Sequence, residues 1–204
     1  MSADTQDFWT NYTGYRRYNI KRHSTEEDVV DDLRKELSPY FRIHARPQLQ
    51  GRLCTGRRLR ADLVLQPLQP WGGRHTHHSY APFTLEVKRD QNIADITKAL
   101  GQAADYAHGI WDTTQLADAG WVDLPSDGRM LSCITWLDTV GYCDPTQTCD
   151  RMWIDRIAGR LNVMVLVHTQ WSGWELNMSG NTQWCQDRGM ANSAFNARVK
   201  DGSR

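Results

Sequence analysis

Hydrophobic residues recur along the chain with two different periods, and each period predicts one kind of element. In residues 24–37, STEEDVVDDLRKEL, the apolar side chains form the single stripe of an amphipathic helix. Ser24 or Thr25 followed by acidic residues forms a capping box, and Pro39 ends the helix. A step of about 100° per residue places Glu26 at the centre of the stripe, so we expect this acid to face the core. The alternative is that Glu26 lies in the first turn and only favours the helix dipole. The stripe consists of Val29, Val30, Leu33 and Leu37.

Three segments alternate apolar and polar residues with a period of two, which predicts strands. These segments are residues 40–49, 58–66 and 83–89. In 58–66, RLRADLVLQ, Asp62 lies on the face opposite Leu63. In 83–89, FTLEVKR, Glu86 and Lys88 share the face opposite the apolar residues. The long connection between the last two segments holds three Pro, a Gly pair and the sequence HTHH.

The second half of the chain continues the exchange of helices and strands. An alanine-rich helix is predicted for residues 93–108, in which Lys98, Gln102 and Tyr106 lie away from the apolar stripe. A strand at 130–137, a helix at 150–161 and strands at 163–169 and 174–178 follow. This order predicts the α/β class, with a central mixed β-sheet flanked by helices. The stripe of the alanine-rich helix is Ile96, Leu100, Ala103 and Ala107.

Length and composition favour a single globular domain. The chain has 204 residues, of which 40% are hydrophobic and 24% charged, so it can bury a core. We divide it into a polar, basic arm at 1–24, a core at 25–176 and a polar tail at 177–204. No segment approaches the ~18 consecutive apolar residues of a membrane span, no secretory signal is visible, and the five Cys form no CxxC pair. We therefore expect a cytoplasmic protein without a membrane partner, and the short Trp-rich chain suits a bacterial or phage-infected cell.

Charge is unevenly distributed although its sum is zero. Residues 1–60 hold twelve Lys or Arg and eight Asp or Glu, and the remainder is acidic. This suits an arm that contacts phosphate and a site that holds cations, although so small an excess also fits compositional noise. In the arm, Arg16 and Arg17 lie between Tyr15 and Tyr18. Such a mixture can contact phosphates and stack on bases, or form an ordinary solvated leader.

Two acids and a lysine carry the candidate chemistry. Asp62 and Glu86 are twenty-four positions apart, which allows their strands to pair as antiparallel neighbours. In that arrangement Asp62, Glu86 and Lys88 converge on one face. Carboxylates hold Mg²⁺ or Mn²⁺, which lowers the pKa of a bound water and stabilises charge on a scissile phosphate. A neighbouring lysine can orient that water and offset the developing negative charge.

The order Asp62, Glu86-Val87-Lys88, Gln102 and Tyr106 resembles the D…ExK…QxxxY signature of the PD-(D/E)XK nuclease superfamily. The QxxxY element is similar to that of the RecB-like branch, which also includes phage exonucleases. In such enzymes a helix with an acid precedes a strand hairpin carrying D and ExK, and a helix with the Gln follows. The resemblance covers residues 25–110 and implies a restriction-endonuclease-like core. Ala61 stands where the family name has proline, and His23 lies at a different offset from the histidine of many RecB-like members.

The resemblance implies a Mg²⁺- or Mn²⁺-dependent nuclease acting on DNA, with RNA left open. Asp62, Glu86, Glu26 and the carbonyl of Val87 would bind the metal, and Lys88 would position the nucleophilic water. Gln102 and Tyr106 would hold the site or contact the DNA backbone. The mode of cutting, the strand preference and the oligomeric state stay open. The basic residues that we expect to contact phosphates are Arg16, Arg17, Arg57, Arg58, Arg60 and Lys98.

Other features leave alternatives open. The histidines at 75, 77 and 78 can bind a transition metal, but without a nearby carboxylate or Cys they are more simply spare side chains of a loop. No GxxxxGK loop is present, so we expect no nucleoside triphosphate. The alternatives to a nuclease are a non-catalytic nucleic-acid-binding module of the same fold and a protein-interaction factor that uses Trp-rich loops. Apolar patterning assigns Trp111, Trp121, Trp136 and Trp153 to the core and leaves Trp71, Trp171, Trp174 and Trp184 in polar loops, where they can stack on bases.

Overall fold

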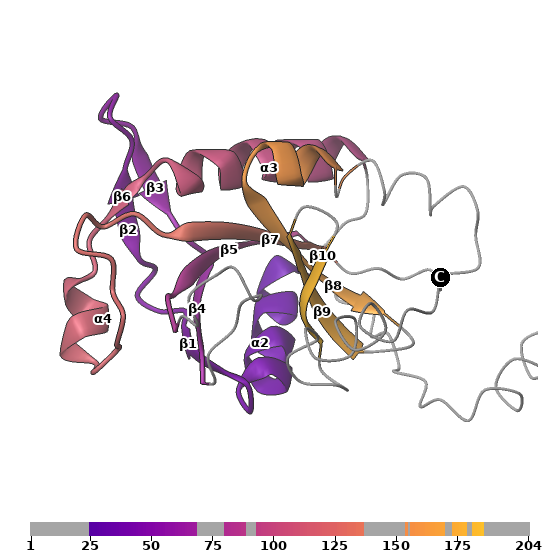
Figure 1. Cartoon of the computed structure of the whole chain (residues 1–204), viewed down its shortest axis with the longest axis horizontal. Coiled ribbons are helices and arrows are strands. Elements are labelled where there is room, and N and C mark those ends of the chain that lie inside the picture. The colour runs from indigo at the N-terminus through magenta and orange to yellow at the C-terminus, as the bar shows by residue number, and fades with distance from the viewer. Residues whose placement is uncertain are drawn as a thin grey trace, which may run out of the picture.

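The computed structural model describes residues 25–68, 80–88, 93–136, 154, 156–169, 173–178 and 181–185. Its helices are α2 (Glu26–Leu37), α3 (Ile93–Ala107) and α4 (Thr114–Asp118), and residues 156–160 are also helical (Figure 1). Its strands are β1 (Phe41–His44), β2 (Gln50–Arg52), β3 (Arg58–Arg60), β4 (Leu63–Pro67), β5 (Phe83–Lys88), β6 (Ile110–Trp111), β7 (Leu131–Trp136), β8 (Val163–Thr169), β9 (Gly173–Met178) and β10 (Asn181–Cys185).

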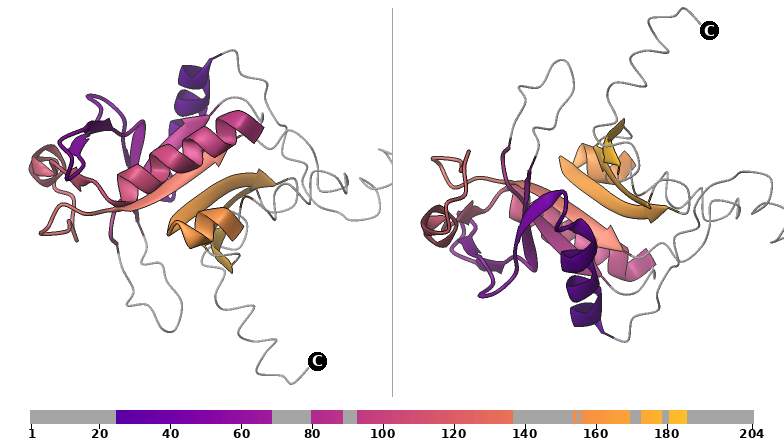
Figure 2. Two further views of the ribbon diagram at one scale, coloured as in Figure 1. Left: turned by 90° about the horizontal axis from the view of Figure 1, so that it is seen from above. Right: turned by 90° about the horizontal axis from the view of Figure 1, so that it is seen from below.

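Seven strands form one mixed sheet in the order β1-β4-β5-β7-β8-β9-β10. The pairs β5–β7 and β7–β8 are parallel, and the other neighbours are antiparallel. The chain passes from β5 to β7 through α3, as parallel neighbours require a long connection. Figure 2 shows the sheet curling between α2 and α3. The prediction of an α/β protein with a mixed sheet flanked by helices is thus confirmed.

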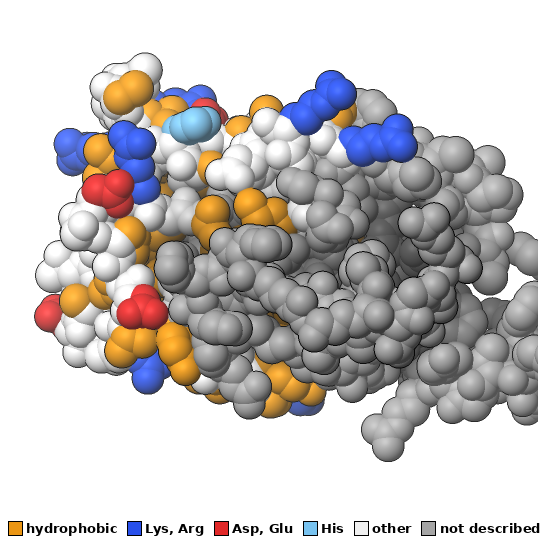
Figure 3. Space-filling view, viewed as in Figure 1, with side chains coloured by type: hydrophobic (Ala, Val, Ile, Leu, Met, Phe, Trp, Pro, Cys, Tyr) orange, Lys and Arg blue, Asp and Glu red, His pale blue; other side chains and the backbone are white. Residues whose placement is uncertain are grey.

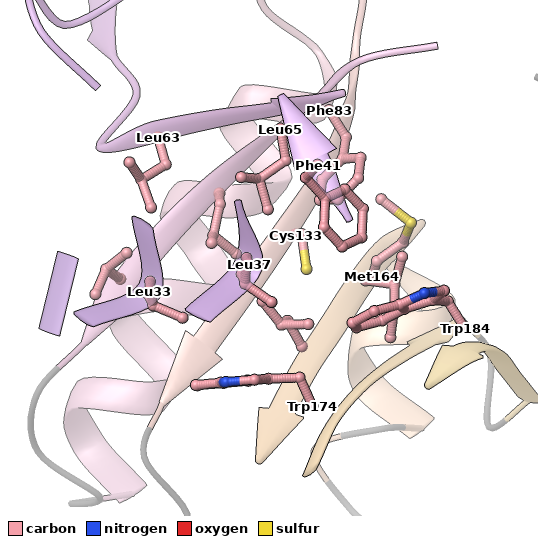
Figure 4. Close-up of a cluster of buried hydrophobic side chains, with 14 of the residues drawn as sticks. Leu33, Leu37, Phe41, Leu63, Leu65, Phe83, Cys133, Met164, Trp174 and Trp184 are labelled. Atoms are coloured by element: carbon pink, nitrogen blue, oxygen red, sulfur yellow. The ribbon is translucent and has the colours of Figure 1, made fainter. Parts of the chain in front are cut away.

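Alternate residues of the central strands fill two separate cores, one on each face of the sheet. In β8, Met164 packs with the cluster under α2, whereas Val165 packs with the cluster under α3. The cluster under α2 also contains Trp174 and Trp184, which lie among its aliphatic side chains (Figure 4). These two tryptophans were expected in polar loops, and that expectation is wrong because β9 and β10 bury them.

Helix α2 begins as its sequence predicts. The Thr25 side chain accepts a hydrogen bond from the Asp28 N–H at 3.1 Å, and the Asp28 carboxylate accepts one from the Thr25 N–H at 3.0 Å. Val29 is the first buried residue of the helix, followed by Leu33 and Leu37. The expectation that Glu26 faces the core is wrong, because Glu26 lies in the exposed first turn, before the packed stripe begins.

A second sheet of three strands, β3-β2-β6, lies at one end of the molecule (Figure 1). We call it the small sheet. Its strands have two or three residues each, too few for a hydrophobic period to predict β2 and β6. Leu59 and Trp111 on its inner side pack in a third buried cluster with Tyr106 of α3. Gly51 is required here, because a Cβ at this position would lie 2.7 Å from the Trp111 ring.

Two predicted boundaries need correction. Residues 58–66 are not one strand, because β3 joins the small sheet and β4 the large one, with Ala61 and Asp62 between them. The polar tail does not begin at 177, because β9 continues to Met178 and β10 pairs with it at the edge of the sheet. A smaller correction concerns Ala107, which was placed in the core stripe and is only half-buried at the end of α3.

Several expectations concern residues outside the described ranges. These include the arm with Arg16 and Arg17, the histidines at 75, 77 and 78, and the tryptophans at 71, 153 and 171. Trp111 and Trp121 are buried as expected. Within the described ranges, no helix is both long enough and apolar enough to span a membrane.

Candidate active site

Asp62 and Glu86 meet across neighbouring strands. The antiparallel register pairs Leu63 of β4 with Leu85 of β5, so Asp62 stands opposite Glu86 one step further along. Because Asp62 lies just before β4 begins, its side chain replaces a strand carbonyl as the partner of β5. The Val87 N–H donates to Asp62 Oδ2 at 3.0 Å. This bond holds the Asp62 carboxylate against the end of the strand that carries Glu86 and Lys88.

Glu86 is the most enclosed acid of the site. Its side chain is only 2% exposed, and each of its oxygens has a partner. Lys88 Nζ lies 2.7 Å from Glu86 Oε1, and the Tyr106 hydroxyl lies 2.8 Å from Glu86 Oε2. The same hydroxyl lies 2.5 Å from the carbonyl oxygen of Arg60, so its one proton serves two acceptors. Tyr106 therefore ties α3 to β3 and to β5.

The balance of charge at the site is negative. Lys88 Nζ also lies 3.6 Å from Glu26 Oε1, so one ammonium serves acids from α2 and β5 while Asp62 stands beside them. Burial and the charge of Glu86 raise the pKa of Asp62 to about 7, and the Val87 N–H and Lys88 only partly oppose this rise. Burial alone would lower the pKa of Lys88, but its hydrogen bond to Glu86 and the surrounding carboxylates raise it. Burial and Glu86 raise the pKa of Tyr106, so its hydroxyl stays protonated.

A cavity of about 450 Å³ opens beside these groups. Asp62 and Val87 form one wall, the first two turns of α2 form another, and the segment after β1 closes the third. Glu27 and Arg46 make an ion pair between the last two walls. The cavity is lined by Glu26, Glu27, Val30, Ala45, Arg46, Pro47, Gln48, Asp62 and Val87. Its size suits a small polar group such as one phosphodiester with its neighbours.

Gln48 belongs to the site, although no sequence pattern predicted it. It lines the cavity, and its Nε2 lies 3.5 Å from Asp62 Oδ1. Gln48 sits in an irregular segment between β1 and β2, where no hydrophobic period fixes the direction of a side chain. The one general rule that could have pointed to Gln48 is that binding and catalytic residues are often found in loops held by a rigid scaffold.

The other predicted residues are distributed differently. Gln102 lies on α3 with its Oε1 buried and without a hydrogen-bond partner among the described residues, and it makes no bond to the two acids. Lys98 is exposed one turn earlier. Arg57 is engaged in an ion pair with Asp105 of α3, whereas Arg58 and Arg60 are exposed.

The donor set suits a hard divalent cation of the Mg²⁺ class. Asp62 and Glu86 offer only oxygen ligands, and burial together with the charge of Glu86 raises the pKa of Asp62. Among the described residues, no three His, Cys, Asp or Glu side chains are grouped so that they could hold a metal. Mg²⁺ does not need such a cage, because it is commonly held by one or two carboxylates and completes its shell with water and substrate oxygens. Asp62 and Glu86 could therefore hold Mg²⁺ or Mn²⁺, and this ligand set stays a prediction.

Replacing Tyr106 by Phe is expected to lower the free energy of unfolding by about 1–3 kcal/mol, because Glu86 Oε2 and the Arg60 carbonyl lose their donor. Urea denaturation measures the change. Tyr80→Phe, at an exposed position, serves as the control and should change stability by less than about 0.5 kcal/mol. A loss no larger than that of the control would show that the hydroxyl does not hold the site.

No family model matches the chain, and no match was found among the curated proteins or the solved structures.

Proposed function

We propose that the protein is a metal-dependent deoxyribonuclease of the D…ExK type with a restriction-endonuclease-like core. One observation carries the proposal: Asp62, just before β4, forms one charged group with Glu86 and Lys88 of the antiparallel neighbour β5, and Asp62 lines an open cavity. The order of elements supports it, since an acid-bearing helix precedes the strands and α3 with Tyr106 follows. A purely structural group of charges would gain nothing from a cavity next to it.

Each residue has a distinct task in this proposal. Asp62 and Glu86 hold Mg²⁺ or Mn²⁺, which when bound lowers the pKa of water and neutralises charge on the phosphate. Lys88, held between Glu86 and Glu26, positions the attacking water and offsets negative charge as the phosphodiester is cleaved. Tyr106 keeps Glu86 in place through its hydroxyl. The role of the Val87 carbonyl as a further ligand stays a prediction, while its N–H orients Asp62.

Cleavage of DNA tests the proposal directly. The protein is incubated with plasmid and with linear DNA in Mg²⁺, in Mn²⁺ or in EDTA, and we expect cleavage only with a divalent metal. Asp62→Asn should reduce the rate at least about 100-fold, because the variant keeps the shape of the side chain but loses the charge that holds the metal. Asp118→Asn removes one carboxylate from an exposed position of α4 and should cleave like the wild type.

Two outcomes contradict a D…ExK nuclease that uses this site. One is the absence of cleavage by the wild type under every metal, on duplex and single-stranded DNA alike. The other is cleavage that Asp62→Asn retains while EDTA stops it, since a metal held elsewhere would then do the chemistry.

A second candidate is a nucleic-acid-binding module of the same fold without turnover. It is favoured by the fact that both oxygens of Glu86 already have protein partners, so this acid is satisfied without a metal. The two candidates separate cleanly, because the module binds DNA equally well in EDTA and in Mg²⁺ and leaves the DNA intact.

A further inference from the structure

The outward side of the small sheet is cationic. Residues of β2, β3 and β6 alternate between buried and exposed, so each strand turns one set of side chains away from the body. Arg52 of β2 is paired directly with Arg58 of β3, and Gln50 with Arg60. Arg52 also stands opposite Ile110 of β6. Figure 3 shows Lys and Arg side chains gathered at this end of the molecule.

Among the ion pairs of the described residues, none involves Arg52, Arg58 or Arg60. The neighbouring Asp105 is paired with Arg57. Asp112, whose N–H donates to the carbonyl of Gln50, is a charged carboxylate near the small sheet, but it forms no ion pair with the three arginines. Like charges directly opposite each other in a sheet repel, so the Arg52–Arg58 pair destabilises the free protein and is relieved by an anion.

The small sheet is firmly attached and adjoins the candidate active site. The Trp111 ring lies over Gly51, and Arg57 near the β2–β3 turn is tied to Asp105 of α3. The chain runs directly from Arg60 in β3 to Asp62, and the carbonyl of Arg60 accepts from Tyr106. An anion bound by Arg58 or Arg60 on the outward side would therefore lie within a few residues, along the chain, of the first acid of the site.

We propose that the outward side of the small sheet binds the phosphate backbone of duplex DNA next to the site of cleavage. The inference rests on the proposed function for its choice of DNA. Arginine is well suited to phosphate oxygens, and Arg52 and Arg58 stand side by side on β2 and β3. The outward side carries Arg, Gln and Ile and no aromatic residue, since Trp111 points inward. It offers charge without a surface for stacking bases, which favours duplex over single-stranded DNA.

Binding of a fluorescent duplex at increasing salt, in EDTA, tests this inference. The variant combines Arg52→Gln with Arg58→Gln and leaves Arg60 intact, because Arg60 adjoins the site. Each lost phosphate contact should make the slope of log K against log salt about 0.9 less negative, so the double variant should differ from the wild type by nearly two. Between about 50 and about 200 mM salt, the wild type should then lose roughly tenfold more affinity than the variant. The melting temperature of the double variant should equal or exceed that of the wild type, because the repulsion between Arg52 and Arg58 is gone.

The matched control is Arg156→Gln with Arg160→Gln, two exposed arginines on the helical residues 156–160. It removes the same charge and should keep the wild-type slope. An equal change of slope in both double variants, or no change in either, overturns the inference. The inference is also overturned if single-stranded DNA or duplex RNA binds as tightly as duplex DNA and depends equally on Arg52 and Arg58.

The two proposals fail in distinguishable ways, because binding is measured without metal. If the wild type cleaves DNA but the Arg52 and Arg58 variant binds with an unchanged slope, the proposed nuclease activity stands and the small sheet is excluded as the DNA-binding surface. If the slope changes as expected but no metal supports cleavage, the small sheet stands and the nuclease is excluded.

Discussion

Asp62→Asn should make the metal-free protein more stable at pH 8 by up to about 4 kcal/mol, even though it removes a residue of the proposed active site. The reason is the pKa of Asp62, which burial and the charge of Glu86 raise from 3.8 to about 7. A carboxyl whose pKa is higher in the folded than in the unfolded protein costs nothing at low pH. As pH rises from about 4 to about 7, the unfolded chain has released the proton that the folded one keeps, so stability falls. Above pH 7 the full cost remains, and asparagine avoids it.

Urea denaturation in EDTA at pH 5 and pH 8 measures this effect. The difference between Asp62→Asn and the wild type should be larger at pH 8, and Asp118→Asn should show no such dependence. Asparagine keeps an oxygen that can accept from the Val87 N–H, so the geometry of the bond is retained. A variant that is destabilised, or stabilised equally at both pH values, would show that Asp62 does not carry this cost.

Metal addition should narrow the difference in stability between the wild type and Asp62→Asn. A cation that binds the folded protein stabilises it by mass action, so Mn²⁺ at about 100 times its dissociation constant should add about 2.7 kcal/mol to the wild type. Asp62→Asn should gain much less. The acid at position 62 thus costs stability in the free protein and returns a large part of it when its ligand is bound, which is a common property of functional residues.

The central pairing of the site was predictable because a strand allows only two directions for a side chain. With Leu63 and Leu85 buried on one face, Asp62 and Glu86 had to be close once β4 and β5 paired. Tyr106 was placed by the helical period in the same way, one turn after Gln102. These periods do not depend on the rest of the fold.

Other contacts of the site were not predictable from such periods. The helical period places Glu26 on the same face of α2 as the apolar stripe. The stripe packs against the sheet only from Val29 onward, so Glu26 in the first turn is exposed. Gln48 reaches Asp62 from an irregular segment, where the backbone alone decides the direction. The small sheet pairs strands of two and three residues and takes Arg58 and Arg60 away from the large sheet. Each of these features depends on tertiary contacts between distant parts of the chain.

Lys88→Met should destabilise the protein by about 3–5 kcal/mol, the usual cost of leaving a buried charge without its partner. Glu86 is 2% exposed and 2.7 Å from Lys88 Nζ, and Asp62 stands beside it, so the ammonium compensates more than one acid. Urea denaturation at pH 8 measures the loss. Lys35→Met, at an exposed position of α2, is the control and should change stability by less than about 0.5 kcal/mol.

A double-mutant cycle separates the lost charge from the changed shape. Glu86→Gln added to Lys88→Met removes the unpaired carboxylate while keeping an oxygen for the Tyr106 hydroxyl, so much of the lost stability should return. If the double variant is as unstable as the sum of the single ones, the two charges are not coupled.

Lys88→Arg keeps a positive charge beside Glu86 and should largely keep the fold. Because a guanidinium cannot take the place of a compact ammonium over the attacking water, this folded variant should still lose most DNA cleavage, which ties Lys88 to the chemistry as well as to stability.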